Sequence, residues 1–173
     1  MPSTYTLISS NVLASSAASV TFSAIPSTYT DLVLRISSRS SFSGTNSFFL
    51  SFNGAPSGTS FSTTSLSGRG STAFSLRTND YLAVEVEELS QDAGTTANTF
   101  NSVEYYIPNY LVSANKPVGV SGAKENNSST VNLVNASAGL WRNTSAITSI
   151  TIDEASGNFV SGSSFYLYGI KNS

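Results

Sequence analysis

The chain has 173 residues, a formal net charge of −2, and neither histidine nor cysteine. It therefore has no imidazole base, no thiolate nucleophile, none of the usual nitrogen and sulfur ligands of zinc, and no disulfide bond. Serine and threonine fill 54 positions, but a hydrophobic fraction of 39% is too high for a disordered chain. We expect one folded domain that lacks the charge excess needed to attract nucleic acid or a membrane surface.

Alternation of apolar and polar residues with period two is the main structural signal. Leu32, Leu34 and Ile36 fall on one side of an extended segment. Arg35 and Ser37 fall on the other side, and this pattern predicts a half-buried strand. The strands predicted in chain order cover residues 4–8, 19–23, 31–39, 47–53, 82–87, 99–107, 117–121, 131–134, 147–152 and 164–170.

Turn-forming residues such as the Asn53–Gly54 pair separate these segments. Around the strand at 47–53, residues 37–75 are rich in Ser, Gly and Thr, which predicts extended surface loops. Only residues 90–99 and 111–115 could hold a helical turn. The sequence thus predicts an all-β chain, folded as a single antiparallel, jelly-roll-like β-sandwich over residues 20–173. The residues expected in its core are Leu32, Leu34, Ile36, Ile150, Ile152, Phe165 and Leu167.

The N-terminal segment, residues 1–19, has two interpretations. It is either an arm that adds a strand to a neighbouring subunit, with Leu7 and Leu13 in shallow pockets, or the first strand of the protein's own sheet. Tyr5 belongs to the same segment. The residues up to Ala24 contain no basic stretch and no long apolar run, so they predict neither a signal peptide nor a membrane span.

Acidic residues are the candidates for catalysis or metal binding. Glu85 and Glu87 project from the same face of a predicted strand, roughly 7 Å apart, within the range of glycosidase carboxylate pairs. No aromatic cluster accompanies them, so solvated edge-strand residues are the favoured interpretation. Asp80, Asp92 and Asp153 lack the spacing of a calcium-binding loop. We expect a protein that is not an enzyme and that uses no metal or cofactor.

Two tyrosines near Pro108 are candidates for partner binding. Sugars and partner proteins both use flat aromatic surfaces that carry a hydroxyl group. Strand alternation must expose one of the neighbours Tyr105 and Tyr106 unless both faces are covered. Trp141 is more typical of a core position. The candidate partner-binding residues are Tyr5, Leu7, Leu13, Tyr106 and Tyr110.

The C-terminal third resembles virion proteins of tailed bacteriophages, a group of capsid decoration or cement proteins and tail-fibre β-sandwich modules. The pattern runs through residues 138–152 (AGLWRNTSAITSITI) and 155–170 (ASGNFVSGSSFYLYGI). Upstream, residues 22–36 (FSAIPSTYTDLVLRI) and the FNG turn at 52–54 are similar to the same group. The resemblance covers most of the chain. The family has no agreed catalytic residues, so it implies none here.

This resemblance implies a virion protein that is assembled in the host cytoplasm and forms closed homo-oligomers, with trimers favoured. The expected function is that of a decoration or cement protein, which binds the major capsid protein or other virion proteins and stabilises the phage head surface. The alternative is a receptor-binding module of a tail or head fibre that recognises a host surface glycan. A short chain without heptad repeats favours the first function.

Overall fold

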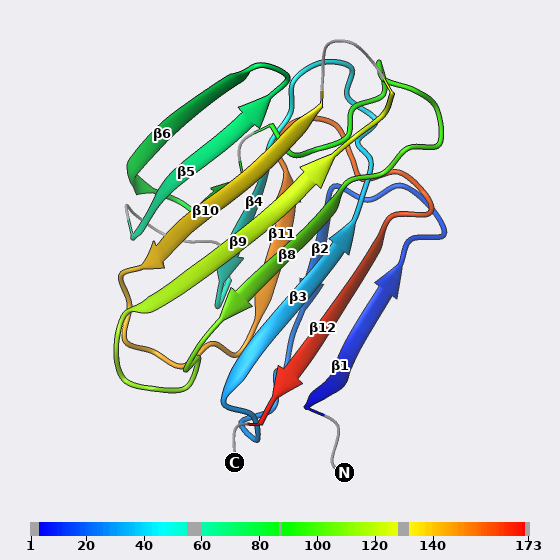
Figure 1. The fold of residues 1–173 in the computed structure, drawn as a ribbon. Helices are drawn as coiled ribbons and strands as arrows, with labels where there is room; N and C mark the ends of the chain where they lie inside the picture. Colours follow the sequence, from blue (N-terminus) through cyan, green and yellow to red (C-terminus); the bar gives the residue numbers. More distant parts are fainter. Residues whose placement is uncertain (1–3, 55–59, 87, 128–131, 172–173) are drawn as a thin grey trace.

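A computed structural model describes residues 4–54, 60–86, 88–127 and 132–171. These residues form two antiparallel sheets packed face to face and contain no helix, hence none that could cross a membrane (Figure 1). The predicted all-β sandwich is confirmed. The strands are β1 (Tyr5–Val12), β2 (Ser19–Phe22), β3 (Asp31–Ser37), β4 (Phe48–Phe52), β5 (Phe61–Arg69), β6 (Thr72–Tyr81), β7 (Val84–Val86), β8 (Ser102–Ile107), β9 (Lys116–Lys124), β10 (Leu133–Trp141), β11 (Ile150–Glu154) and β12 (Ser164–Ile170).

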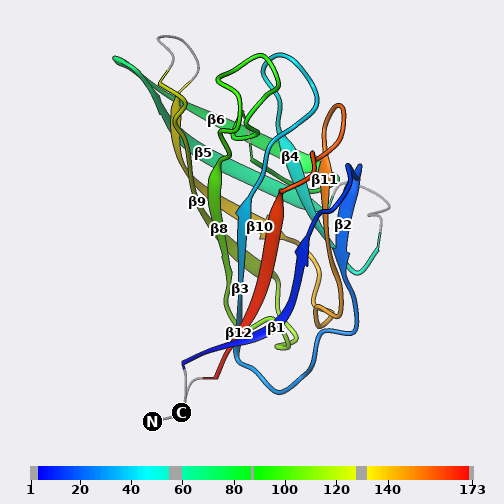
Figure 2. The ribbon, with the colours of Figure 1, turned by 90° about the vertical axis from the view of Figure 1, so that its right-hand side faces the viewer.

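The larger sheet has eight strands in the order β1-β12-β3-β8-β9-β10-β5-β6, and the smaller sheet has four in the order β2-β11-β4-β7. The chain passes repeatedly from one sheet to the other, as in a jelly roll, but here the strands divide eight and four. Figure 2 shows the smaller sheet on one side of the larger one. We call the opposite side of the larger sheet the outer face. No strand of the described chain lies against it.

The core lies between the two sheets and is filled by the inward residues of alternating strands. Phe52, Phe61 and Trp141 form an aromatic cluster there, with ring centroids 5.3 Å apart for Phe52 and Trp141 and 6.1 Å apart for Phe61 and Trp141. Trp141 is therefore a core residue. Each of the seven residues predicted in the core is at most 3% exposed, which confirms them: Leu32, Leu34, Ile36, Ile150, Ile152, Phe165 and Leu167.

Residues 61–81 form the long strands β5 and β6, where the sequence had indicated surface loops within residues 37–75. That prediction is wrong because the inward positions of β5 are mostly hydroxyl side chains. Thr63, Ser65 and Ser67 are all buried, so burial alternates along β5 while hydrophobicity does not. β6 is exposed or half-exposed along its whole length and shows no alternation at all.

The N-terminal segment takes the second of its two interpretations, since β1 pairs antiparallel with β12 of the same sheet. It forms one edge of the larger sheet, and β6 forms the other. Figure 1 shows the start of β1 beside the end of β12, as expected when the first strand pairs with the last. An arm that leaves the domain is therefore not the conformation of residues 5–12 in this structure.

The predicted turn at Asn53 is confirmed, and it fastens the end of β4 to a distant loop. Asn53 and Gly54 have φ angles of 58° and 94°, in the left-handed region that Asn and Gly tolerate. The Asn53 side chain accepts a hydrogen bond from the Thr148 amide at 2.7 Å and donates one to the Ala146 carbonyl at 2.8 Å. The residues before β11 are thus held against the end of β4.

Candidate binding face

The outer face of the larger sheet is the candidate site because its side chains are not used to pack the two sheets together. Strand alternation decides which residues lie there. On β12, Phe165 and Leu167 are fully buried in the core, whereas Tyr166 and Tyr168 point outward and are half-buried. The final strand therefore presents two tyrosines to the outer face.

A row of aromatic and aliphatic side chains crosses the outer face at the level of Tyr168. The register aligns Leu7 with Tyr168, Tyr168 with Val33, and Val33 with Tyr106 on four successive strands. Val33 is only 1% exposed although it points outward. Directly opposed side chains in a sheet lie within contact distance, so we attribute its burial to the two flanking tyrosines. The row thus forms a small apolar layer on the outside of the sandwich.

Arg35 places a positive charge beside this row. Its Nε donates a hydrogen bond to Oε2 of Glu104 at 2.8 Å, and this bond raises the pKa of the guanidinium. Its Cζ also lies 5.5 Å from the ring centroid of Tyr5 and 5.7 Å from that of Tyr168, within the range of cation–π contacts. Three partners therefore fix the orientation of a guanidinium that stays accessible to solvent.

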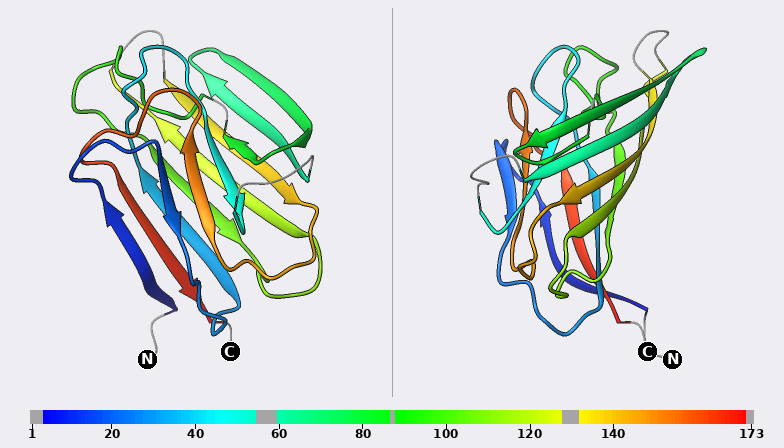
Figure 3. Two further views of the ribbon diagram at one scale, coloured as in Figure 1. Left: turned by 180° about the vertical axis from the view of Figure 1, so that it is seen from behind. Right: turned by 90° about the vertical axis from the view of Figure 1, so that its left-hand side faces the viewer.

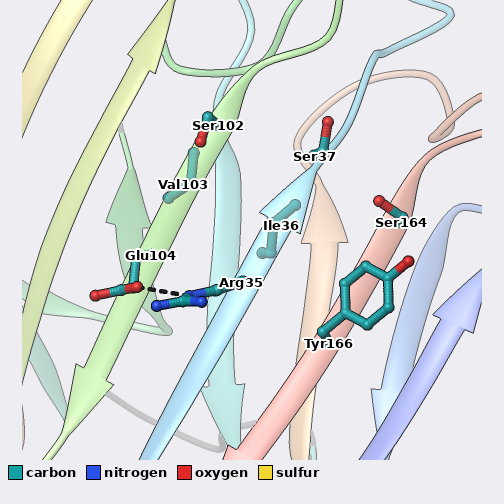
Figure 4. A pocket seen from close by; sticks show the side chains of 8 residues that line it. All are labelled: Arg35, Ile36, Ser37, Ser102, Val103, Glu104, Ser164 and Tyr166. Carbon is teal, nitrogen blue, oxygen red and sulfur yellow. Dashed lines mark hydrogen bonds and ion pairs between the residues drawn. The ribbon is translucent and has the colours of Figure 1, made fainter.

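An open depression of about 270 Å³ adjoins the Arg35–Glu104 pair (Figure 4). Its wall includes side chains from β3, β8 and β12, with the Tyr166 ring on one side and the ion pair on the other. The groups on offer are guanidinium donors, carboxylate acceptors, hydroxyls and one aromatic ring, which suit a sugar or a polar protein segment. The outward residues that line it are Arg35, Ser37, Ser102, Glu104, Ser164 and Tyr166.

Tyr106 is anchored at its hydroxyl and exposed at its ring. The hydroxyl donates a hydrogen bond of 2.9 Å to Oδ2 of Asp31, which is 3% exposed. This hydrogen bond is the main cause that raises the pKa of Tyr106. The other oxygen of Asp31 accepts the Asn109 amide at 2.9 Å. Tyr106 as a whole is 41% exposed, so it offers a rigid aromatic surface that loses little entropy on binding.

The other end of the outer face, over β9, β10 and β5, is flat, and its own residues carry no charge. Arg77 of β6 reaches its edge, since its guanidinium donates a hydrogen bond to the Thr64 hydroxyl at 2.9 Å. The outward residues are small or apolar, and the most exposed aliphatic ones, Val134 and Leu66, are 63% and 60% exposed. Aliphatic side chains this exposed in an apolar patch are typical of surfaces that contact another macromolecule. The residues of this flat end are Ser62, Thr64, Leu66, Gly68, Pro117, Gly119, Ser121, Ala123, Val134, Ala136, Ala138 and Leu140.

Three of the five predicted partner-binding residues lie on the outer face: Tyr5, Leu7 and Tyr106. The other two do not present a side chain to a partner, which corrects the prediction. Leu13 is 8% exposed because it packs in the core after β1, and Tyr110 is fully buried with its hydroxyl donated to the Pro26 carbonyl. Tyr110 follows the end of β8, where strand alternation no longer indicates direction.

Sequence reasoning missed Arg35, Glu104 and Tyr168, which complete the site with Tyr5 and Tyr106. The signal for Tyr168 was present, because period two in the predicted strand 164–170 places it opposite the core residues. The pairing of Arg35 with Glu104 had no such signal. It depends on the register between β3 and β8, which joins residues 69 positions apart.

Glu154, the last residue of β11, belongs to a partly buried polar network. Its carboxylate accepts hydrogen bonds from the Asn46 amide and from the Ser90 hydroxyl, the latter at 2.9 Å. Burial raises the pKa of Glu154 to about 7. Nearby, the Lys124 ammonium donates to the Ser90 carbonyl at 3.3 Å, and burial lowers its pKa to about 8.

The other acidic candidates lie on different elements of the fold. Glu85 is half-buried on β7, and Glu87 lies outside the described residues. Asp80 forms an ion pair with Arg142. Within the described residues no group of three or more acidic side chains could hold a metal ion.

Comparison with models of protein families gives no match, and no curated protein matches the chain.

Proposed function

We propose that this protein is a non-enzymatic structural protein of a tailed-phage virion, and that its role is that of a capsid decoration or cement protein. It is assembled in the host cytoplasm, docks on the major capsid protein or another virion protein, and stabilises the head surface. The sequence pattern at residues 138–170 supports the virion assignment. The all-β sandwich supports a rigid module whose broad side is free to bind.

The observation that carries the docking proposal is the flat end of the outer face. A sheet surface of small and aliphatic residues can approach another protein closely, and none of its own residues has a hydrated charge to lose when it does so. Two large aliphatic side chains, Val134 and Leu66, rise from it and are more than half exposed. Tyr106, with its fixed and exposed ring, lies beyond β9 on the same face and supplies an aromatic anchor.

Val134→Lys is expected to weaken attachment to the particle at least tenfold without unfolding the protein. A lysine on the flat end must be desolvated when the face is covered, and a cost of about 1.4 kcal/mol already gives a factor of ten. As an exposed substitution it should change the free energy of unfolding by less than about 0.5 kcal/mol. Attachment is measured by adding purified variant to particles that lack the protein and counting the bound copies.

Leu82→Lys is the matched control, because Leu82 is also a large aliphatic residue, 52% exposed, but lies beside the smaller sheet. It should attach like the unchanged protein. If Leu82→Lys blocks attachment and Val134→Lys does not, the docking surface is on the side of the smaller sheet and the proposal for the outer face is wrong.

The depression beside Arg35 favours the alternative function, a receptor-binding module for host glycan. Sugar recognition combines an aromatic ring with fixed hydrogen-bonding groups, and Tyr166 lies across the depression from the Arg35–Glu104 pair. We expect the two functions to separate by mutation. Arg35→Ala would abolish binding to purified host surface glycan and leave particle attachment intact, since this exposed ion pair contributes under about 1 kcal/mol to stability. If the unchanged protein does not bind the glycan, the receptor-binding function is ruled out.

A further inference from the structure

β6 is a long edge strand with little to cover it. Its ten residues pair only with β5 among the described strands, and none of them is buried. Leu76 is 42% exposed although it aligns with the buried Ser65, because the smaller sheet does not extend over it. Figure 3 shows the β5–β6 hairpin projecting from the rest of the sandwich. A free edge of this length is a template for pairing with another chain.

The other edges of the two sheets are protected in ways that β6 is not. β2 and β7, which end the smaller sheet, have only four and three residues. β1 is interrupted by a bulge between Leu7 and Ser9. In β6 the register with β5 is regular from Thr72 to Thr78 and shifts only between Thr78 and Tyr81. The regular stretch contains no proline, and Arg77 is its single charged residue. Natural proteins normally use prolines, bulges and charged side chains to block edge pairing.

The turn before β6 decides which of its backbone groups face outward. Arg69 aligns with Thr72 across the two-residue turn Gly70–Ser71, and Gly70 has a φ angle of 55°. In such a turn the residues on either side form a hydrogen-bonded pair. Hydrogen-bonded and non-hydrogen-bonded pairs alternate along an antiparallel ladder. The backbone groups of Thr72 and of every second residue after it therefore form hydrogen bonds with β5. The backbone groups of the residues between them point away from the sheet: Ala73, Ser75 and Arg77.

From this pattern we infer that β6 pairs antiparallel with β6 of a second copy of this chain, about a two-fold axis at Ser75. This register pairs every residue from Thr72 to Thr78, and it places Phe74 of each copy opposite Leu76 of the other on the uncovered inner side. This register brings no like charges together, because Arg77 of each copy lies opposite Ala73 of the other. A register centred on Arg77 would place two like charges directly opposite each other.

The contact joins two eight-stranded sheets into one continuous sheet and covers the half-exposed Phe74 and Leu76. It does not depend on the proposed virion function. It specifies an isologous dimer, whereas the resemblance to virion proteins implies trimers. An edge-to-edge contact buries less surface than a standard interface, so we expect dimers at protein concentrations on the order of 10 to 100 μM.

The test uses charge at the two-fold axis, measured by analytical ultracentrifugation of the full chain. Ser75→Lys and Ser75→Glu each place like charges opposite one another in a homodimer, and each should weaken self-association about five-fold or more. A mixture of the two variants should restore the dimer, because lysine then faces glutamate. Ser10→Lys makes the same change on the opposite edge strand and should leave the dimer intact.

A dimer that both single variants weaken and their mixture restores supports the two-fold at Ser75. The inference is overturned by a monomer or a trimer of the unchanged protein at these concentrations. It is equally overturned if Ser75→Lys has no effect, if mixing fails to restore the dimer, or if Ser10→Lys dissociates it. Circular dichroism of each variant verifies that the sandwich remains folded, and Ser75 is suitable because it is exposed to solvent.

Discussion

Phe61→Ala is expected to lower the free energy of unfolding by about 3–5 kcal/mol, the usual cost of emptying a fully buried phenylalanine site. Phe61 is 0% exposed and packs against Phe52 and Trp141, with ring centroids 5.9 and 6.1 Å away. Three elements meet in this cluster, so the neighbouring backbone cannot collapse to fill the space. Denaturant unfolding followed by tryptophan fluorescence measures the loss, since Trp141 is the single tryptophan.

Ser62→Ala is the control, because Ser62 is the next residue of β5 and points toward the outer face. It should change stability by less than about 0.5 kcal/mol. The contrast between the two neighbours tests the placement of β5 itself. Equal and small effects at both positions would mean that residues 61–69 are a surface loop, as the sequence alone had suggested.

The second large effect is a loss of stability as pH rises through the acidic range. The pKa of Glu154 is about 7 in the folded protein and has an ordinary value of 4.5 when exposed. Between these values the folded protein keeps a proton that the unfolded chain releases. The free energy of unfolding therefore falls as pH rises from about 4.5 to about 7. A shift of this size corresponds to about 3 kcal/mol.

Glu154→Gln should remove this dependence, because glutamine has the shape of the protonated carboxyl and does not titrate. Thermal or denaturant unfolding at several pH values gives the difference between the variant and the unchanged protein. That difference should shift in favour of the variant by about 3 kcal/mol between pH about 4 and about 8. Ser62→Ala, which changes no titratable group, is the control and should show no such shift. A constant difference for Glu154→Gln would show that its carboxyl is not buried in solution.

Lys124 makes the free energy of unfolding rise with pH in the alkaline range, the opposite of the effect of Glu154. Burial lowers its pKa to about 8 from an ordinary value of 10.5, so the unfolded chain binds more protons between these values. Stability contributed by this residue rises with pH across that window. The combined contribution of Glu154 and Lys124 to stability is therefore lowest near pH 7 to 8. Lys124→Met should flatten the alkaline part of the profile.

Strands with apolar inward positions were predictable from the sequence, and strands with polar inward positions were not. Leu32, Leu34 and Ile36 identified β3 because hydrophobicity alternates there together with burial. In β5 burial alternates but Thr63 and Ser65 occupy the inside, so nothing in the pattern indicated a strand. Apolar residues alternate along a strand when a second sheet covers one of its faces. No sheet of the described chain covers β6, so its sequence carries no such pattern.

The binding face was only partly predictable for a similar reason. Tyr5, Leu7 and Tyr106 could be proposed one by one as exposed residues of predicted strands. Their assembly into a single row with Tyr168 required the strand order β1-β12-β3-β8, which joins the first and last strands of the chain. Local patterns do not encode such long-range pairing. The burial of Glu154 is a tertiary effect of the same kind, since its partners come from distant loops.

The most direct test of the virion assignment is to count this protein in purified phage particles by quantitative mass spectrometry. A decoration or cement protein occupies symmetry-related positions over the whole head, so the account predicts hundreds of copies per particle. About a dozen copies would identify a tail component and support the glycan-binding alternative. Particles that contain none of this protein, although the host cell produces it, would contradict the proposed function.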